Sequence, residues 1–257
     1  NCEILNCGGD GIRLLDSVNP TISRCRIHDN HGFGILCTGE SRGLIRCNEV
    51  WANLNAGVLI RGHSLGVFEE NKVFDGQQGG FWVEDHARCT IHNNDVFRNA
   101  KTGIQVGGQS DPVVSRNRVY DGHKLGVVVH DRGHGAFAHN EIYSNAMAGV
   151  GVTDDSCPLF HGNVVRDGRG GGLVIHKAAR GVFERNVISG NSHAGVGIKG
   201  TARPLLDGNE VSDNKGHGVW FQERAAGSLQ NNTIERNQRC GVLIADSAAP
   251  LLDSNLV

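Results

Sequence analysis

Carboxylates and histidines that recur at one spacing are the first residues of this chain whose types could do chemistry. Asp131 and Asp154 are separated by one period of a repeat that runs through the chain, with His130 before the first and Asp155 after the second. Paired carboxylates can hydrolyse glycosidic bonds, and a cluster of six or more oxygens can bind calcium. Because Asp also favours tight bends, we interpret these residues as solvated turn residues and predict no catalytic residues.

Histidine and cysteine could instead hold a metal ion. His63 and His86 are separated by the same interval, but two histidines without a third ligand make an incomplete metal site. We therefore predict no metal and no cofactor. Cys2, Cys25 and Cys37 are interpreted as buried thiols, because unpaired cysteine behaves as a small apolar residue.

Two tryptophans are candidates for binding a partner. Trp82 and Trp220 occupy the same position in two different repeats. Tryptophan dominates the binding energy of many interfaces, so we predict these two as anchors of a binding face. The residues predicted to accompany them are Glu84, Gln105, Val128, His130 and His176.

The repeat that must position these side chains is marked by a glycine at every twenty-third position. The residue after this glycine is always apolar, and a second apolar residue follows two positions later, which is typical of a strand. Two further apolar columns, which include Ile22 and Ile27, predict three short strands per repeat. The recurring glycines are Gly11, Gly34, Gly57, Gly80, Gly103, Gly126, Gly149, Gly172, Gly195, Gly218 and Gly241.

An asparagine recurs between the second and third apolar columns in ten of the eleven repeats. Asparagine tolerates left-handed backbone, and stacked amides can hydrogen-bond along a stack. We therefore predict a structural ladder of asparagines at an inward bend. The ladder residues are Asn48, Asn71, Asn94, Asn117, Asn140, Asn163, Asn186, Asn209, Asn232 and Asn255.

Three strands per repeat, without helical periodicity, predict an all-β fold. We expect a right-handed parallel β-helix of the pectin-lyase-like type, with about eleven 23-residue coils stacked about 4.8 Å apart. Residues 1–257 form one domain in this interpretation. Because neither end shows a helix or a polar cap, we expect the domain to be part of a longer chain without its caps.

Alternation along the strand after the glycine predicts which side chains face outward. The outward positions include Leu36, Leu59 and Leu243 but only one carboxylate, Glu84, so we expect an exposed apolar stripe that docks a partner. A second outward column is aromatic and is either a sugar or base platform or a structural ladder, and we favour the ladder. This column contains His28, Trp51, Phe74, Phe97, Tyr120 and Tyr143.

The composition excludes several partner classes. Lys and Arg number 25 against 27 Asp and Glu, which gives a net charge of −2 without a basic block, so we expect no nucleic acid partner. No apolar run approaches the roughly 18 residues of a membrane span, so we expect no membrane partner. Eight cysteines in 257 residues are too few for a disulfide scaffold, so we expect a reducing compartment, cytoplasmic or nuclear, and no Cys-x-x-Cys pair suggests zinc.

Several repeats resemble a known family. The segments NPTISRCRIHDN, FDGQQGGFWVEDH, NNDVFRNAKTGIQV and NEIYSNAMAGVGV are similar to the β-helix of F-box-only ubiquitin-ligase substrate receptors, and to the wider carbohydrate-binding and sugar-hydrolase (CASH, NosD-like) group. The resemblance covers all eleven repeats. It implies a β-helix that recognises protein substrates, while a separate F-box recruits the ligase. No F-box pattern is visible in this chain.

Three functions follow from these patterns. The first is a non-catalytic protein-recognition scaffold, which binds a protein substrate or flanking domain through the face that runs from Trp82 to Trp220. The alternative is a carbohydrate-binding or carbohydrate-active β-helix, a lyase, hydrolase or epimerase, with a polysaccharide partner and a periplasmic or extracellular location. The third is a structural rod. The missing pair of carboxylates disfavours an enzyme.

Overall fold

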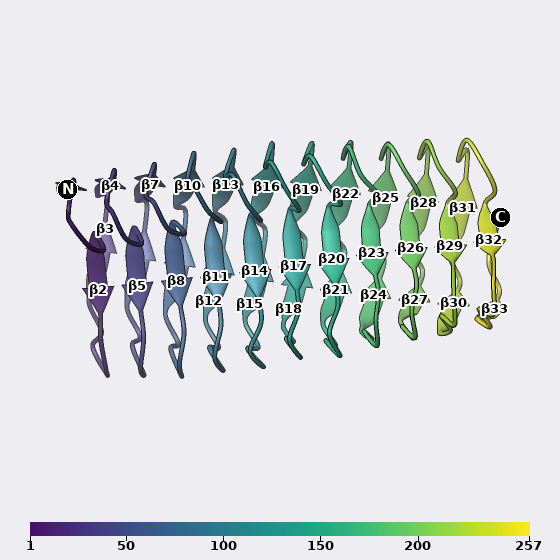
Figure 1. The fold of residues 1–257 in the computed structure, drawn as a ribbon, viewed down its shortest axis with the longest axis horizontal. Coiled ribbons are helices and arrows are strands. Elements are labelled where there is room, and N and C mark those ends of the chain that lie inside the picture. The colour runs from purple at the N-terminus through teal and green to yellow at the C-terminus, as the bar shows by residue number, and fades with distance from the viewer.

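Strands of three residues recur along the whole chain and stack into a rod. The computed structural model describes residues 1–257 and contains strands but no helices. The strands form three parallel sheets of eleven strands each, so one coil of the rod consists of one strand from each sheet (Figure 1). The two termini lie at opposite ends of the rod. The predicted all-β parallel β-helix with eleven coils and three strands per coil is confirmed.

We name the sheets A, B and C. Sheet A contains β1 (Glu3–Leu5), β4 (Arg26–His28), β7 (Glu49–Trp51), β10 (Lys72–Phe74), β13 (Asp95–Phe97), β16 (Arg118–Tyr120), β19 (Glu141–Tyr143), β22 (Val164–Arg166), β25 (Val187–Ser189), β28 (Glu210–Ser212) and β31 (Thr233–Glu235). Sheet B contains β2 (Ile12–Leu14), β5 (Ile35–Cys37), β8 (Val58–Ile60), β11 (Phe81–Val83), β14 (Ile104–Val106), β17 (Val127–Val129), β20 (Val150–Val152), β23 (Leu173–Ile175), β26 (Val196–Ile198), β29 (Val219–Phe221) and β32 (Val242–Ile244). Sheet C contains β3 (Thr21–Ser23), β6 (Leu44–Arg46), β9 (Val67–Glu69), β12 (Thr90–His92), β15 (Val113–Ser115), β18 (Ala136–Ala138), β21 (Leu159–His161), β24 (Val182–Glu184), β27 (Leu205–Asp207), β30 (Ser228–Gln230) and β33 (Leu251–Asp253).

The strand register follows the sequence repeat, so equivalent residues of successive coils lie side by side. Val73 pairs with Val96, for example, and Phe81 with Ile104. The inward columns from all three sheets form one core inside the rod. A shift of one residue would turn every apolar side chain outward, so burial of these columns specifies the register.

Close packing explains the recurring glycine. A Cβ placed on Gly103 would lie 2.5 Å from Val119 Cγ1 and 2.7 Å from the carbonyl oxygen of Gly126, the equivalent glycine of the next coil. These distances are too short for any side chain. The corner between sheets A and B therefore requires glycine because the backbones of successive coils approach one another there.

The predicted asparagine ladder is confirmed, between sheets C and A. Nδ2 of Asn117 donates to Oδ1 of Asn140 (3.0 Å), the next rung, and to the carbonyl oxygen of Ile91 (2.9 Å). The position of the left-handed backbone was predicted wrongly. It lies on the residue before each asparagine, such as Arg116 with φ of 54°, because the asparagine must turn its amide inward to reach the next rung.

A second asparagine ladder, which was not predicted from the sequence, follows sheet A. Nδ2 of Asn191 donates to Oδ1 of Asn214 (2.9 Å), and all the rungs except Asn237 are buried. Glycine replaces the asparagine in three coils, where its backbone N–H still donates to the next amide. The asparagine rungs are Asn30, Asn53, Asn99, Asn145, Asn191, Asn214 and Asn237.

The outer face of sheet A carries side chains that pair with one another. The aromatic column is a stack in which Tyr120 and Tyr143, for example, lie 4.8 Å apart with an interplanar angle of 2°. Because each ring covers the face of the next, only ring edges remain for a ligand, which supports the structural interpretation over a sugar or base platform. Beside it, Arg118 pairs with Asp95 (2.6 Å) and Lys72 with Glu49 (2.9 Å).

Candidate functional site

Sheet B positions the binding residues predicted from sequence. Trp82, Gln105 and Trp220 occupy the middle of their strands, between two buried residues, and their half-buried side chains lie on the outer face. Val128 has the same position in β17. Glu84, His130 and His176 follow their strands directly, at the edge of the sheet nearer sheet C.

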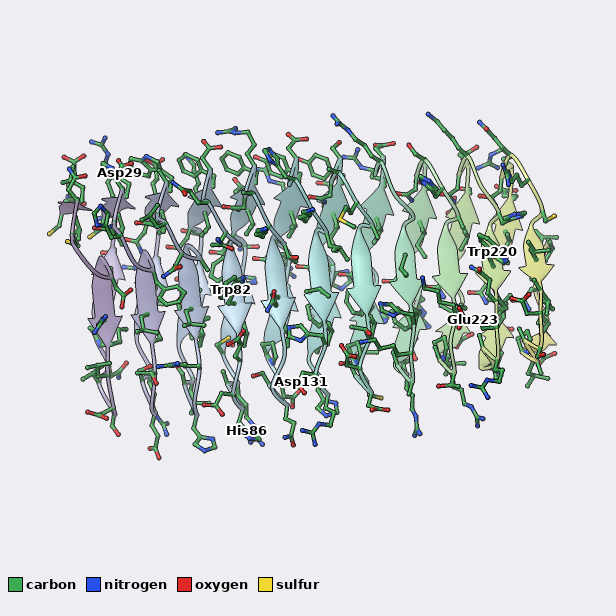
Figure 2. All side chains as sticks on the ribbon, in the orientation of Figure 1. Asp29, Trp82, His86, Asp131, Trp220 and Glu223 are labelled. Atoms are coloured by element: carbon green, nitrogen blue, oxygen red, sulfur yellow. The ribbon has the colours of Figure 1, made fainter.

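These residues do not form one site. Trp82 and Trp220 are six repeats apart, which places them about 29 Å apart along the rod (Figure 2). Indole Nε1 of Trp82 and of Trp220 and Nε2 of His130 are buried without a hydrogen-bond partner. Trp82 packs against Phe33, with ring centroids 6.2 Å apart in an edge contact.

The apolar stripe predicted to be exposed on sheet B is covered at its N-terminal end. Leu36 and Leu59 are only 7% and 5% exposed. Phe33 in the second coil reaches Trp82 in the fourth and so spans the intervening coil, where Leu59 lies. The prediction was wrong because the turn before each corner glycine also contributes side chains to this face.

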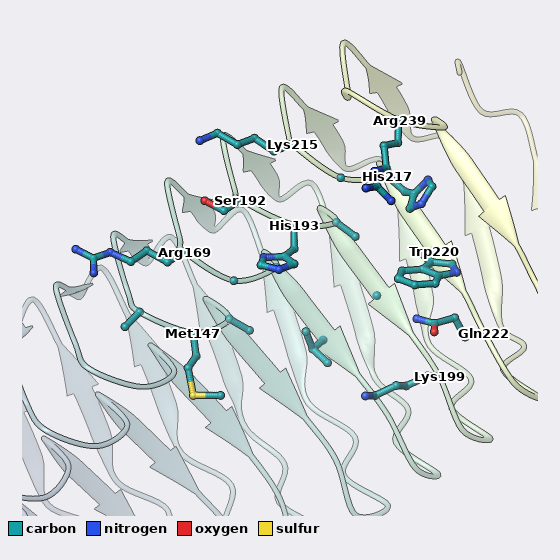
Figure 3. A pocket seen from close by; sticks show the side chains of 18 residues that line it. Met147, Arg169, Ser192, His193, Lys199, Lys215, His217, Trp220, Gln222 and Arg239 are labelled. Atoms are coloured by element: carbon teal, nitrogen blue, oxygen red, sulfur yellow. The ribbon is translucent and has the colours of Figure 1, made fainter.

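A groove opens on the same face in the C-terminal half of the rod. It has a volume of about 730 Å³ and crosses β23, β26 and β29 together with the turns that precede them (Figure 3). Trp220 forms one wall and Met147 lies at the other end. The lining also includes Arg169, His193, Lys199, Lys215, His217 and Arg239.

The groove exists because β26 has a glycine where its neighbouring strands have a valine and a tryptophan. Gly197 pairs with Val174 on one side and Trp220 on the other, so the middle of β26 is a gap between a valine and a tryptophan side chain. A Cβ on Gly197 would have no neighbour closer than 4.0 Å, which shows that the space beside it is open. The tryptophan indole therefore stands above a floor of backbone, in a position to contact a ligand.

The groove is positively charged. Its lining contains Arg169, Lys199, Lys215 and Arg239 but no aspartate or glutamate. None of these four cations forms an ion pair within the chain, although pairs are frequent elsewhere on the rod. Free cations without nearby anions attract an anionic ligand.

Carboxylates on the turns beside the groove are already paired. Asp167 accepts from Arg166 (2.6 Å), and Asp213 accepts from Arg236 (3.0 Å). The Arg236 guanidinium holds the pKa of the Asp213 carboxyl below its usual range, because it donates to the ionised form. These carboxylates therefore do not cancel the positive charge of the groove.

Two imidazoles at the groove, those of His176 and His217, have a lowered pKa. Burial, and then the positive charges of Lys199 and Lys177, lower the pKa of His176. Burial and the neighbouring Arg239 likewise lower the pKa of His217. Oγ1 of Thr153 lies 3.4 Å from Nδ1 of His176, and a neutral imidazole at this place can accept a proton.

The histidines and aspartates considered from sequence as metal or catalytic sites lie outside the groove. The rings of His63 and His86 stack 5.9 Å apart, and no group of three or more His, Cys, Asp and Glu residues could hold a metal ion. Asp154 accepts a hydrogen bond from Lys177, which lowers the pKa of its carboxyl. No helix has the length and apolarity needed to cross a membrane.

The thiol prediction was partly wrong. Cys25 and Cys37 are buried, as predicted, but Cys2 is exposed. Cys2 lies just before β1, in the first coil of the rod. Two residues at the same position of the repeat, Cys2 and Cys25, therefore differ in burial.

The cations of the groove were not predicted from sequence. Arg169 and Lys215 share one turn position of the repeat, and His193 and Arg239 share the next. The detectable signal was basic residues at these positions without acidic residues at the neighbouring ones. The depth of the groove had no such signal, because it depends on the glycines beneath.

Comparisons with known proteins agree with this fold. The family model of the right-handed β-helix region matches residues 1–119 and 102–257. The mannuronan C-5 epimerase AlgE6 A-module of Azotobacter vinelandii is similar with a TM-score of 0.77 at 16% identity, over 95% of this chain and 80% of that one. No curated protein matches the sequence.

Two further solved structures have the same architecture. The periplasmic alginate epimerase AlgG has a TM-score of 0.66 at 19% identity, over 91% of this chain, which spans 60% of that protein. The pectate lyase Pel9A has a TM-score of 0.59 at 13% identity, over 96% of this chain and 70% of that one. At these identities the likeness establishes the fold alone.

Proposed function

The chain belongs to the right-handed β-helix family, and from that premise we propose that it binds an anionic polysaccharide in the groove across β23, β26 and β29. The observation that carries this proposal is the set of four unpaired cations in a lining without carboxylates. Carboxylated sugars suit such a lining, because Arg and Lys donate charge-assisted hydrogen bonds to carboxylates. Trp220 supplies the apolar surface against which a sugar ring can pack.

The structural neighbours support a carbohydrate ligand over a protein. They are named as alginate epimerases, a pectate lyase and an α-1,3-glucanase. Protein recognition, which the similarity to F-box-only receptors implies, stays a prediction that none of these neighbours supports. A polysaccharide ligand also fits a periplasmic or extracellular location better than a cytoplasmic or nuclear one.

Removal of the groove charges tests the proposal. We expect Arg169→Gln/Lys215→Gln/Arg239→Gln to weaken binding of polygalacturonate at least tenfold, because each lost contact between charged groups contributes about 0.5–1 kcal/mol. Isothermal titration calorimetry measures the affinity. Fully methyl-esterified polygalacturonate is the neutral form of the same chain and should bind weakly to the wild type.

A matched variant controls for net charge. Arg24→Gln/Arg116→Gln/Arg185→Gln removes three exposed cations outside the groove and should bind polygalacturonate like the wild type. An equal loss of affinity in both triple variants would contradict binding in the groove. Equal affinity of the wild type for the charged and the esterified polymer would contradict recognition of the carboxylates.

A second candidate function is lyase or epimerase chemistry on a uronate, and His176 favours it. Both reactions begin when a base removes the proton next to the sugar carboxylate. A neutral His176 could accept that proton, and Lys199 beside it could stabilise the negative charge that develops on the carboxylate.

Product analysis tests this second function. A lyase would produce an unsaturated sugar that absorbs ultraviolet light, and an epimerase would exchange the same hydrogen with deuterated solvent. We expect His176→Gln to abolish either signal while polygalacturonate binding persists. Absence of both signals with polygalacturonate and alginate would restrict the protein to binding.

A further inference from the structure

The most exposed apolar column of the rod lies on the outer face of sheet C. The first residue of each sheet C strand points outward, and Val113 and Leu159 are 48% and 40% exposed at this position. Leucine, valine or alanine fills this position in most coils, which is unusual for a solvated sheet face. The apolar members are Leu44, Val67, Val113, Ala136, Leu159, Val182, Leu205 and Leu251.

Opposite charges flank this column in the eighth and ninth coils. Arg180 and Arg203 are exposed on the turns just before β24 and β27. Neither forms an ion pair within the chain, unlike most arginines of sheet A. Glu184 and Asp207 end the same two strands and also point outward, on the other side of the apolar column.

The two acidic residues have only weak or neutral partners. Glu184 lies 3.5 Å from His161, and Asp207 accepts a hydrogen bond from Asn231 (2.8 Å). From one edge to the other, each coil of this patch therefore presents a free cation, an apolar side chain and a carboxylate, and in the eighth coil Arg185 follows that carboxylate. A surface with this order is complementary to itself after a two-fold rotation.

We propose that sheet C docks face to face on sheet C of a second copy of this chain, about a two-fold axis that lies between the two rods and is nearly parallel to them. This rotation exchanges the two edges of the sheet. Arg180 then faces Glu184 of the second copy, and Arg203 faces Asp207 of the second copy, each pair occurring twice. Leu159, Val182 and Leu205 of the two copies meet between them.

The charges at the edges of sheet C favour contact between the two copies only in the C-terminal half of the rod. In the second coil the same rotation would bring Arg42 opposite Arg46, which is repulsive. The two rods therefore diverge by a small angle toward their N-terminal ends. The groove on sheet B is on a different face and stays open, so self-association does not depend on the proposed polysaccharide.

Complementary charge reversals test the proposal. One variant reverses the basic edge, Arg180→Glu/Arg203→Glu, and the other reverses the acidic edge, Glu184→Arg/Asp207→Arg. Sedimentation velocity of the wild type should show a dimer whose fraction rises with protein concentration. Each variant alone should be a monomer, because like charges then meet on both sides of the apolar column.

Mixing gives the decisive result. An equimolar mixture of the two variants should form a dimer, because the acidic edges of one then face the basic edges of the other. Circular dichroism confirms that each variant keeps the strand content of the wild type. A wild type that stays monomeric at about 100 µM would overturn the proposal, and so would variants that dimerise alone or fail to dimerise when mixed.

Discussion

Trp220 and Trp82 have the same position in the repeat but different surroundings. Trp220 stands beside Gly197 and the groove, and the ring of His217 lies 5.4 Å from its own. Trp82 packs against Phe33 beside a covered part of the same sheet. The identity of a residue in a repeat therefore does not determine its role, because the residues before and beside it decide whether its indole is available.

The two tryptophans should differ in their effect on binding. We expect Trp220→Ala to weaken polygalacturonate binding at least tenfold, because a central aromatic anchor commonly contributes about 2 kcal/mol. Trp82→Ala should change the affinity less than about twofold, since Trp82 does not line the groove. Calorimetry on both folded variants measures this difference, and a larger loss for Trp82 would contradict the placement of the site.

The affinity should also depend on pH through His217. Its pKa is lowered, so the imidazole is neutral above about pH 6.5 and gains a positive charge inside the groove as the pH falls. We expect polygalacturonate binding to strengthen about two- to fivefold from pH 7.5 to 5.5, because one added charge contributes about 0.5–1 kcal/mol.

Protonation of His217 has the opposite effect on folding. The imidazole of His217 has a higher pKa in the unfolded state than in the folded state, so the unfolded state binds the proton first as the pH falls. The folded state therefore loses stability as the pH falls through about 6.5. Calorimetry at constant ionic strength separates binding from folding. His217→Gln should show a smaller change of affinity with pH, and an unchanged pH dependence would assign the effect to another group.

At the scale of elements, the asparagine ladder ties each coil to the next. Nδ2 of Asn117 donates two hydrogen bonds, and its Oδ1 accepts from the backbone N–H (2.9 Å) and Nδ2 (3.0 Å) of Asn94. A buried rung therefore satisfies polar groups of the coils on both sides. Asn255, in the last coil, is half-buried, so water can replace its partners.

Rungs at different depths should contribute differently to stability. We expect Asn117→Ala to lower the free energy of unfolding by about 3 kcal/mol or more, because several buried groups lose their partners at once. Asn255→Ala should cost about 1 kcal/mol or less. Urea denaturation followed by circular dichroism measures both values, and equal losses would mean that burial of the rung does not matter.

The strands could be predicted from sequence because every coil requires the same residue types at the same positions. The corner glycine, the inward apolar columns and the first asparagine ladder are required in nearly every coil, so the repeat reveals them. The second ladder was harder to detect because Gly76 and its equivalents interrupt it. The groove could not be predicted, because it results from differences between coils, such as glycine at 197 beside tryptophan at 220.

At the scale of the whole molecule, the rod presents three different outer faces. Sheet A carries a stack of aromatic rings from His28 to Tyr143, and ion pairs beside it. Sheet B carries the cationic groove, and sheet C carries the apolar column with free charges beside it. A net charge of −2 conceals this arrangement, because it averages over faces that differ in charge.

Hydrogen–deuterium exchange of the whole chain, with and without polygalacturonate, tests the placement of the ligand most directly. We predict slower exchange in the turns at residues 167–172, 190–195, 213–218 and 236–241, which border the groove, and in β26 and β29. The equivalent turns at residues 29–34 and 52–57 serve as internal controls and should exchange at the same rate in both conditions. Protection confined to these control turns, or no protection at a saturating concentration of the polymer, would contradict binding in the groove.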